Sequence, residues 1–111
     1  MTVTAKVLIP AKIAENTQVQ QYVAINVTTI IDKFTATNFS GTAASISVNL
    51  VSADDTAGNQ NIITKTKVLQ PSEVYTFPEL VGQILDRNGF ISTLAGSANA
   101  INIRVSGREI T

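Results

Sequence analysis

Apolar and polar residues alternate with a period of two along much of this chain. In the clearest stretch the apolar positions are Ala44, Ile46, Val48 and Leu50, and they alternate with Ser45, Ser47, Asn49 and Val51. This period is expected of a strand that packs one face on a core and turns the other to water. A similar alternation places Ile30, Phe34 and Ala36 on one face, and turn formers fill Asn38–Thr42. The pattern predicts a long hairpin over Ile30–Ser52, at the centre of an all-β domain.

The N-terminal residues alternate in the same way. Val3, Val7 and Ile9 share one face of a predicted strand over Thr2–Ile9, and Pro10 is expected to end it because proline cannot donate to a strand ladder. Ala11–Gln21 has few apolar anchors. It is either a loop or an arm that becomes ordered only against a neighbouring molecule.

Further short strands are predicted towards the C-terminus. The nearly apolar-free stretch Ser52–Asn61 predicts a solvent loop. The next strand, Ile62–Leu69, has its better core face at Ile62, Thr64, Thr66 and Val68. Strands also follow over residues 73–77, 90–94 and 98–109, the last with a break near Ser106-Gly107.

One segment departs from the strand period. After Pro78, residues Leu80, Val81, Ile84 and Leu85 have helical spacing, which predicts one short helical turn near 79–85. About eight short strands separated by turns favour a single β-sandwich, jelly-roll-like in type. The 111 residues allow one domain. We divide it into an N-terminal arm or edge strand at 1–20 and a β-sandwich domain at 21–111.

Composition excludes several function classes. Eight basic and eight acidic residues balance, with no run of one sign, so no electrostatic footprint for nucleic acid is present. Cys and His are both absent, which removes thiolate chemistry, the commonest general base and the commonest transition-metal ligands. We therefore expect no enzyme activity, no cofactor and no metal. The sequence shows neither a secretion signal nor a membrane-spanning pattern, so no membrane partner is expected.

Three groups of side chains are candidate contacts. Asp54 and Asp55 offer oxygens to a cation, but a solvated loop is the favoured interpretation. Lys65 and Lys67 share a predicted strand face, which Arg104 could extend towards an anionic partner, although solvation and edge protection are favoured. Phe39 in the hairpin turn either plugs the end of the sandwich, which is favoured, or contacts a neighbour.

Several stretches together resemble small virion proteins of tailed bacteriophages. They are Phe34–Asn38, Ser40–Val51, Ile62-Ile63, Leu69-Gln-Pro-Ser-Glu73, Leu80–Leu85 and Ala98–Ile110. In that family a hairpin, a Leu-x-Pro-Gly-Glu turn, a Gly-rich segment and a terminal strand recur in this order. Ser72 stands where the family commonly has glycine, and Asn88–Ile91 replaces the usual Gly-Asp-x-Ile. Residues 1–20 carry no such match.

The resemblance implies a non-enzymatic structural protein of the virion, made in the host bacterial cytoplasm. It would bind capsid or tail subunits and stabilise or decorate the particle as a cement, decoration, head-fibre or knob subunit. The expected partners are other virion proteins and further copies of itself, a trimer among the options. Val3, Val7 and Ile9 would add a strand to a neighbour's sheet edge. The alternative is a carbohydrate-binding or host-adhesion module, with Phe39 and the Ser52–Asn61 loop at its contact end.

Overall fold

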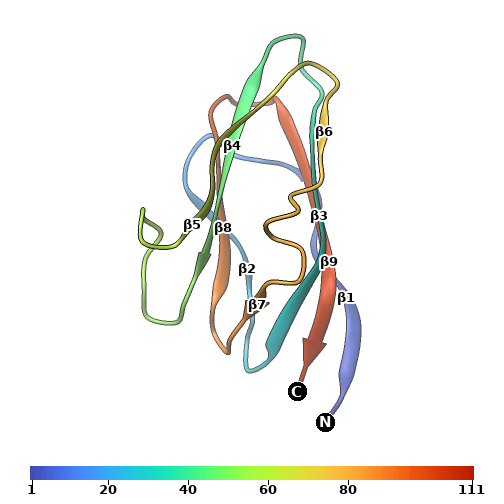
Figure 1. Ribbon diagram of the computed structural model, residues 1–111, viewed down its shortest axis with the longest axis vertical. Coiled ribbons are helices and arrows are strands. Elements are labelled where there is room, and N and C mark those ends of the chain that lie inside the picture. Colours follow the sequence, from blue (N-terminus) through green and yellow to red (C-terminus); the bar gives the residue numbers. More distant parts are fainter.

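The protein is a sandwich of two antiparallel sheets without any helix (Figure 1). A computed structural model describes residues 1–111. Its nine strands are β1 (Val3–Ile13), β2 (Val19–Val23), β3 (Thr28–Asn38), β4 (Ala44–Val51), β5 (Ile62–Leu69), β6 (Val74–Tyr75), β7 (Ile84–Leu85), β8 (Phe90–Ala95) and β9 (Ile101–Ile110). The prediction of a single all-β sandwich is confirmed.

The strand order is that of a jelly roll. The β1 sheet has the order β1-β9-β3-β6, and β7 pairs with β3 beside β6. The β2 sheet has the order β2-β8-β4-β5. The chain crosses repeatedly between the sheets, and Figure 1 shows β6 and β7 as two pieces of one edge, separated by an irregular loop. Counting those two pieces as one strand gives the eight strands of two Greek keys.

The predicted hairpin over Ile30–Ser52 is wrong. β3 belongs to the β1 sheet and β4 to the β2 sheet, so the turn between them carries the chain across the sandwich. Asn38 holds this crossing, because its buried side chain donates to the Thr42 carbonyl at 2.8 Å and to the Leu69 carbonyl at 2.9 Å. Its Oδ1 also accepts from the Ser40 amide at 2.9 Å. Two strands alternate in the same way whether they pair or face each other across a core.

The predicted end of the first strand at Pro10 is also wrong. β1 continues to Ile13, and Pro10 lies within a register shift between Ile9 and Lys12. Proline is tolerated there because a bulge on an edge strand requires no donor from it. The N-terminal segment is thus an edge strand, with Leu8 and Ile9 in the core. The loop or arm predicted over Ala11–Gln21 is strand at both ends.

Bulges shift which residues face the core. Asp32 is an extra residue in β3 between the pairs Ile31–Gly107 and Lys33–Ser106. As a result Ile31 is buried, whereas the predicted Ile30 is only half-buried. The predicted break at Ser106-Gly107 is absent from β9, which faces this bulge without interruption.

The core face predicted for β5 is wrong in its second half. The pairs Val48–Thr64 and Ile46–Lys67 leave two β5 residues opposite one β4 residue, and Thr66 has a φ of 51°. This bulge turns Val68 to solvent and buries Leu69. In β4, Val51 is buried and Leu50 only half-buried, contrary to the alternation.

The helical turn predicted near 79–85 does not form. Successive turns follow Pro78, and Gly82, at a φ of 86°, donates to the Ile31 carbonyl at 2.7 Å. Leu80 and Leu85 are buried, while Val81 and Ile84 are exposed. Two residues facing in and two facing out along a loop imitate helical spacing in the sequence.

Aromatic residues fill the space beneath this loop. The ring of Phe77 lies 4.5 Å from that of Phe34 and 4.6 Å from that of Tyr75, measured between centroids. Phe77 is fully buried although its φ is 45°, a conformation that bulky residues seldom adopt. Burial of a large ring therefore holds the interrupted edge against the core.

Candidate functional site

The N-terminal half of β1, Val3–Val7, forms a free sheet edge. β1 pairs only with β9, and the Thr111 amide donates to the Thr2 carbonyl at 3.0 Å. Backbone groups of successive residues in an antiparallel pair point alternately towards and away from the partner. The backbone carbonyl of Thr2 points towards β9. The backbone N–H and C=O groups of Val3, Ala5 and Val7 therefore point away from β9. We call the outward backbone of Val3–Val7 the free edge.

Apolar side chains accompany this edge. Val3 is 51% exposed and Val7 40% exposed. Both lie on the face of the β1 sheet that is turned away from the β2 sheet, which we call the outer face. Ile9, which the sequence grouped with them, is 1% exposed because a register shift after Val7 turns it inward. Two of the three predicted contact residues are thus accessible, and the third is core.

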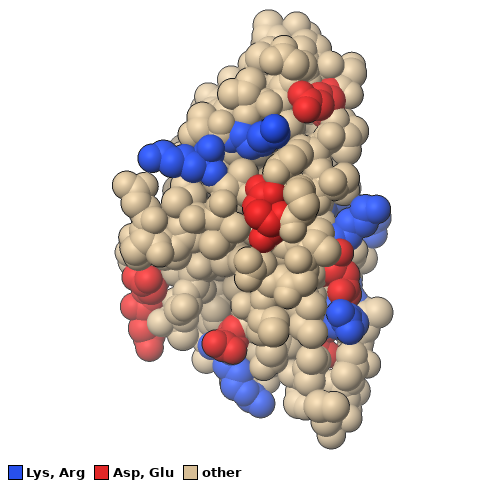
Figure 2. All heavy atoms as spheres, in the orientation of Figure 1, with Lys and Arg blue, Asp and Glu red and all other residues tan.

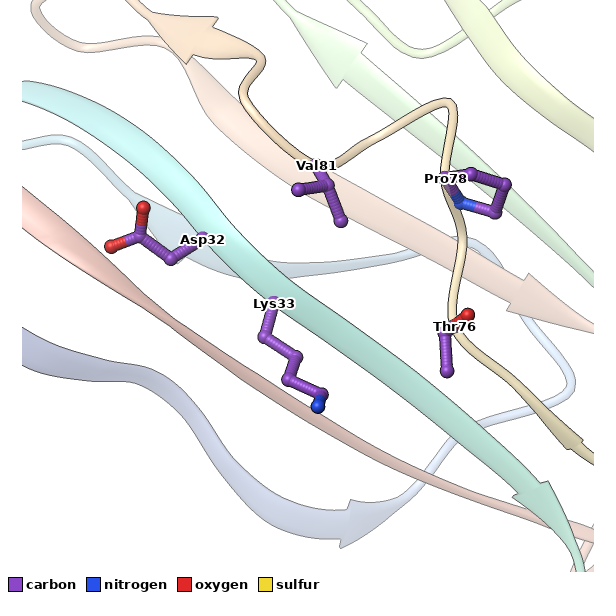
Figure 3. A pocket seen from close by; sticks show the side chains of 5 residues that line it. All are labelled: Asp32, Lys33, Thr76, Pro78 and Val81. Carbon is purple, nitrogen blue, oxygen red and sulfur yellow. The ribbon is translucent and has the colours of Figure 1, made fainter.

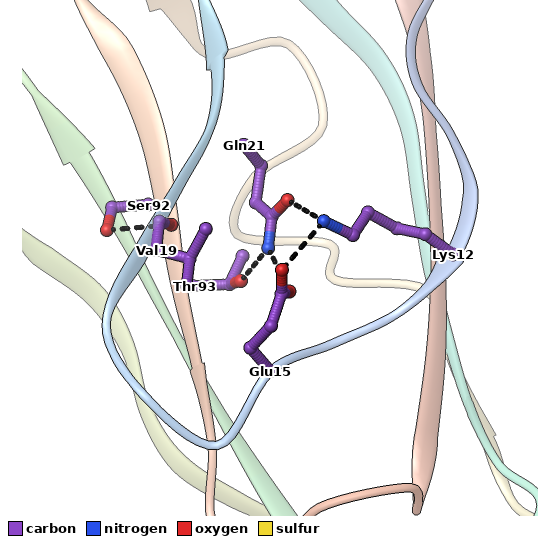
Figure 4. A network of polar contacts seen from close by, with 6 residues as sticks. All are labelled: Lys12, Glu15, Val19, Gln21, Ser92 and Thr93. Carbon is purple, nitrogen blue, oxygen red and sulfur yellow. Dashed lines mark hydrogen bonds and ion pairs between the residues drawn. The ribbon is translucent and has the colours of Figure 1, made fainter.

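The C-terminal half of β1, at Lys12, is connected to the β2 sheet by a network of polar side chains (Figure 4). Lys12 Nζ donates to Gln21 Oε1 at 2.8 Å and to Glu15 Oε2 at 3.0 Å. Gln21 Nε2 donates to Glu15 Oε1 and Thr93 Oγ1, both at 3.0 Å. The hydrogen bonds from Gln21 and Lys12 lower the pKa of Glu15. These bonds order the segment Ala11–Gln21 within one chain, so it is not an arm that becomes ordered only against a neighbouring molecule.

Shallow hollows mark the outer face around the Asp32 bulge. The largest, about 470 Å³, is lined by Asp32 and Lys33 of β3 and by Thr76, Pro78 and Val81 of the loop before β7 (Figure 3). The Asp32 carboxylate accepts from the Arg108 guanidinium at 2.8 and 2.9 Å, and this hydrogen bonding lowers the pKa of Asp32. None of the lining residues forms a nucleophile–base pair.

Arg104 does not extend the strand face of Lys65 and Lys67, because its strand is not adjacent to theirs. Lys65 and Lys67 lie on β5, whereas Arg104 lies on β9 in the other sheet. Lys67 Nζ sits 4.8 Å from the centre of the Tyr75 ring. Arg104 instead shares a small hollow with Lys33 on the outer face. Figure 2 shows charges of both signs scattered over the visible face.

Phe39 and the Ser52–Asn61 loop lie at opposite ends of β4 and share no contact end (Figure 1). Phe39 is 51% exposed and is therefore not a buried plug. The loop is held by hydrogen bonds within itself and to β4, such as Asn61 Nδ2 to the Thr56 carbonyl and Asn49 Nδ2 of β4 to Asn61 Oδ1, both at 2.8 Å. No group of three or more carboxylates that could hold a metal ion occurs in the protein.

Two carboxylates have partners that the sequence did not suggest. Glu79 accepts from the hydroxyls of Thr64 and Tyr75. Burial opposes the charge of Glu79, but these hydrogen bonds outweigh it and lower the pKa. Glu109 accepts from Tyr22, and burial together with this bond raises the pKa of Tyr22 to about 12. Both carboxylates fasten edges of the sandwich and face no open cavity.

Comparison with models of protein families, with curated proteins and with solved structures finds no match to this chain. The structure has no helix long and apolar enough to cross a membrane.

Proposed function

We propose that this protein is a non-enzymatic structural subunit of a bacteriophage particle, which attaches to capsid or tail subunits and stabilises or decorates the particle. The observation that carries the proposal is the free edge, with outward backbone groups at Val3, Ala5 and Val7 and exposed apolar side chains at Val3 and Val7. Incorporation into the particle uses β-augmentation, in which a strand of another subunit of the particle, a further copy of this chain included, pairs with this edge.

The free edge is unusual in lacking the protection that sheet edges commonly carry. Natural edge strands are kept short, charged, bulged or covered. The C-terminal half of β1, after Val7, is protected by Pro10, by the charge of Lys12 and by two register shifts. The N-terminal half has a single charge, Lys6, whose Nζ lies 3.4 Å from Glu109 Oε1. An open, mostly apolar edge of this kind favours pairing with another chain.

The fold and the sequence resemblance support the viral part of the proposal by analogy. Jelly rolls occur in viral capsid proteins and in lectins, among other classes. The stretches that resemble phage virion proteins form strands and turns of this jelly roll and do not include the free edge. The resemblance therefore supports the class of protein, and the edge supports the mode of attachment.

The test measures incorporation of the protein into phage particles. Removal of residues 1–12 would delete the core residues Leu8 and Ile9, so point substitutions are sharper. Ala5→Pro removes an outward N–H and leaves the bonds to β9 in place. Particles purified from bacteria that express the gene are probed by mass spectrometry for the wild-type chain and for this variant. We expect the wild type at many copies per particle and a strong loss for Ala5→Pro.

Ile63→Lys is the matched control. Ile63 is 39% exposed, close to Val7 at 40%, but lies on β5 at the edge of the other sheet. It should leave incorporation unchanged. Absence of the wild-type chain from purified particles would overturn the viral proposal, and full incorporation of folded Ala5→Pro would overturn attachment through the free edge.

A further inference from the structure

We propose that the free edge binds a second copy of this chain, with the two β1 strands antiparallel about a two-fold axis at Ala5. This inference rests on the proposed function and names a partner for the same edge. The two β1 sheets then join into one continuous sheet across the dimer, with the same surface used by both copies.

The register follows from the directions of the backbone groups. A two-fold axis at Ala5 pairs Ala5 with its counterpart and Val3 with Val7 of the second copy. The backbone N–H and C=O groups of all of these residues point away from β9. The pairs therefore exchange about six hydrogen bonds in total. The straight part of the strand ends at Val7, where the register shift begins, so Ala5 is the midpoint of Val3–Val7.

Charge selects the same register. With the axis at Ala5, Lys6 lies opposite Thr4 of the second copy. An axis at Lys6 would place two lysines directly opposite each other, which is unfavourable. An axis at Thr4 would leave Val7 opposite Met1, outside the strand. Lys6 already has Glu109 beside it in its own chain, so its charge is compatible with the paired edge.

The small area buried between the two β1 strands limits the stability of the dimer. Strand pairing over Val3–Val7 buries less than the roughly 1,200–2,000 Å² of stable complexes. The dimer is therefore weak in dilute solution and becomes populated where copies are held close together, as in an assembly.

Disulfide trapping tests the register, because the chain contains no cysteine. Opposed residues in a hydrogen-bonded antiparallel pair have Cα atoms about 5.5 Å apart, within the range of a disulfide. Under mild oxidation we expect Ala5→Cys to form a covalent dimer at least about tenfold faster than Val3→Cys or Val7→Cys alone, because pairing raises the effective concentration of the thiols. A mixture of Val3→Cys with Val7→Cys should cross-link between the two variants faster than either variant does alone.

Urea provides the unfolded control, in which the three single variants should react at equal rates. Equal rates in the folded state as well would overturn the two-fold pairing. If folded Ala5→Cys shows no advantage while Ala5→Pro still loses incorporation into particles, the edge binds a different subunit. In that case this inference is wrong and the proposed function stands.

Discussion

Gly107 of β9 lies directly against the backbone carbonyl of Ile30 in β3. A Cβ at Gly107 would overlap that oxygen and would come within 2.9 Å of Leu8 Cδ1. The contact lies between β9 and β3, the two central strands of the β1 sheet, next to the Asp32 bulge. It also adjoins Leu8, the core residue that anchors β1. Support for the free edge therefore depends on a position where a side chain does not fit.

Gly107→Ala should lower the free energy of unfolding by about 3 kcal/mol, because either the strands separate or the backbone shifts. Urea denaturation checks the value. Gly41→Ala is the control, since nothing lies within 4 Å of a Cβ there and its effect should stay within about 0.5 kcal/mol. Similar midpoints for the two variants would contradict the close approach.

Asn38→Ala should also be strongly destabilising. It removes two hydrogen bonds to carbonyls and leaves the Leu69 carbonyl without this partner in a buried place, so about 3 kcal/mol is expected. Asn102→Ala, on a half-buried position of β9, is the comparison and should cost much less. Calorimetric unfolding of both variants measures the difference, and equal losses would show that Asn38 does not hold the crossing between the sheets.

The two tyrosines should ionise late. Burial and the bond to Glu109 raise the pKa of Tyr22 to about 12, and the bond to Glu79 together with burial raises that of Tyr75 to about 12. An unfolded tyrosine loses its proton near pH 10, so between pH 10 and about 12 the unfolded state binds fewer protons and stability falls as pH rises. Below pH 10 this contribution is fully present.

Ultraviolet absorbance of tyrosinate measures this directly, because the chain has two tyrosines and no tryptophan. Little ionisation should be seen in the folded protein as pH rises through 10, and most of it in urea. Tyr22→Phe and Tyr75→Phe should each remove part of the alkaline loss of stability. A folded-state midpoint near pH 10 would contradict both hydrogen bonds.

Much of the fold was predictable because alternation reports burial. The strands around Phe34, Ile46 and Ile103 were found from a period of two, and their number indicated a sandwich. Alternation does not report which strands pair, so β3 and β4 were predicted as a hairpin. The buried Asn38, which distinguishes a crossing from a hairpin, looks like any turn residue in the sequence.

The candidate site was predictable only in part, for a related reason. Val3 and Val7, predicted as contact residues on an edge or arm strand, lie on an edge strand and are exposed. Ile9 was misplaced because a bulge changes the phase of alternation, and the polar or small residues around a bulge fit either phase. The same effect at Thr66 places Lys67 opposite the buried Ile46, whereas Lys65 is exposed, so the two lysines do not share a strand face as predicted. Only pairing with a neighbouring strand determines where such an extra residue is accommodated.

Ser72 offers a position where the protein should gain stability. Its φ is 66°, a left-handed conformation that costs a residue with a Cβ about 1 kcal/mol and costs glycine almost nothing. The Ser72 side chain is exposed and makes no hydrogen bond, whereas its amide donates to the Asn38 carbonyl at 2.8 Å and is unaffected by the substitution. Ser72→Gly should therefore raise the free energy of unfolding by about 0.5–1 kcal/mol, despite the added flexibility of the unfolded chain.

Ser97→Gly is the matched control for Ser72→Gly, because Ser97 is also an exposed turn serine but has no positive φ. There glycine only increases the conformational entropy of the unfolded chain, so stability should fall slightly. Opposite signs for the two variants in urea denaturation would show that the left-handed turn at Ser72 is real. A loss at both positions would mean that Ser72 adopts an ordinary turn in solution.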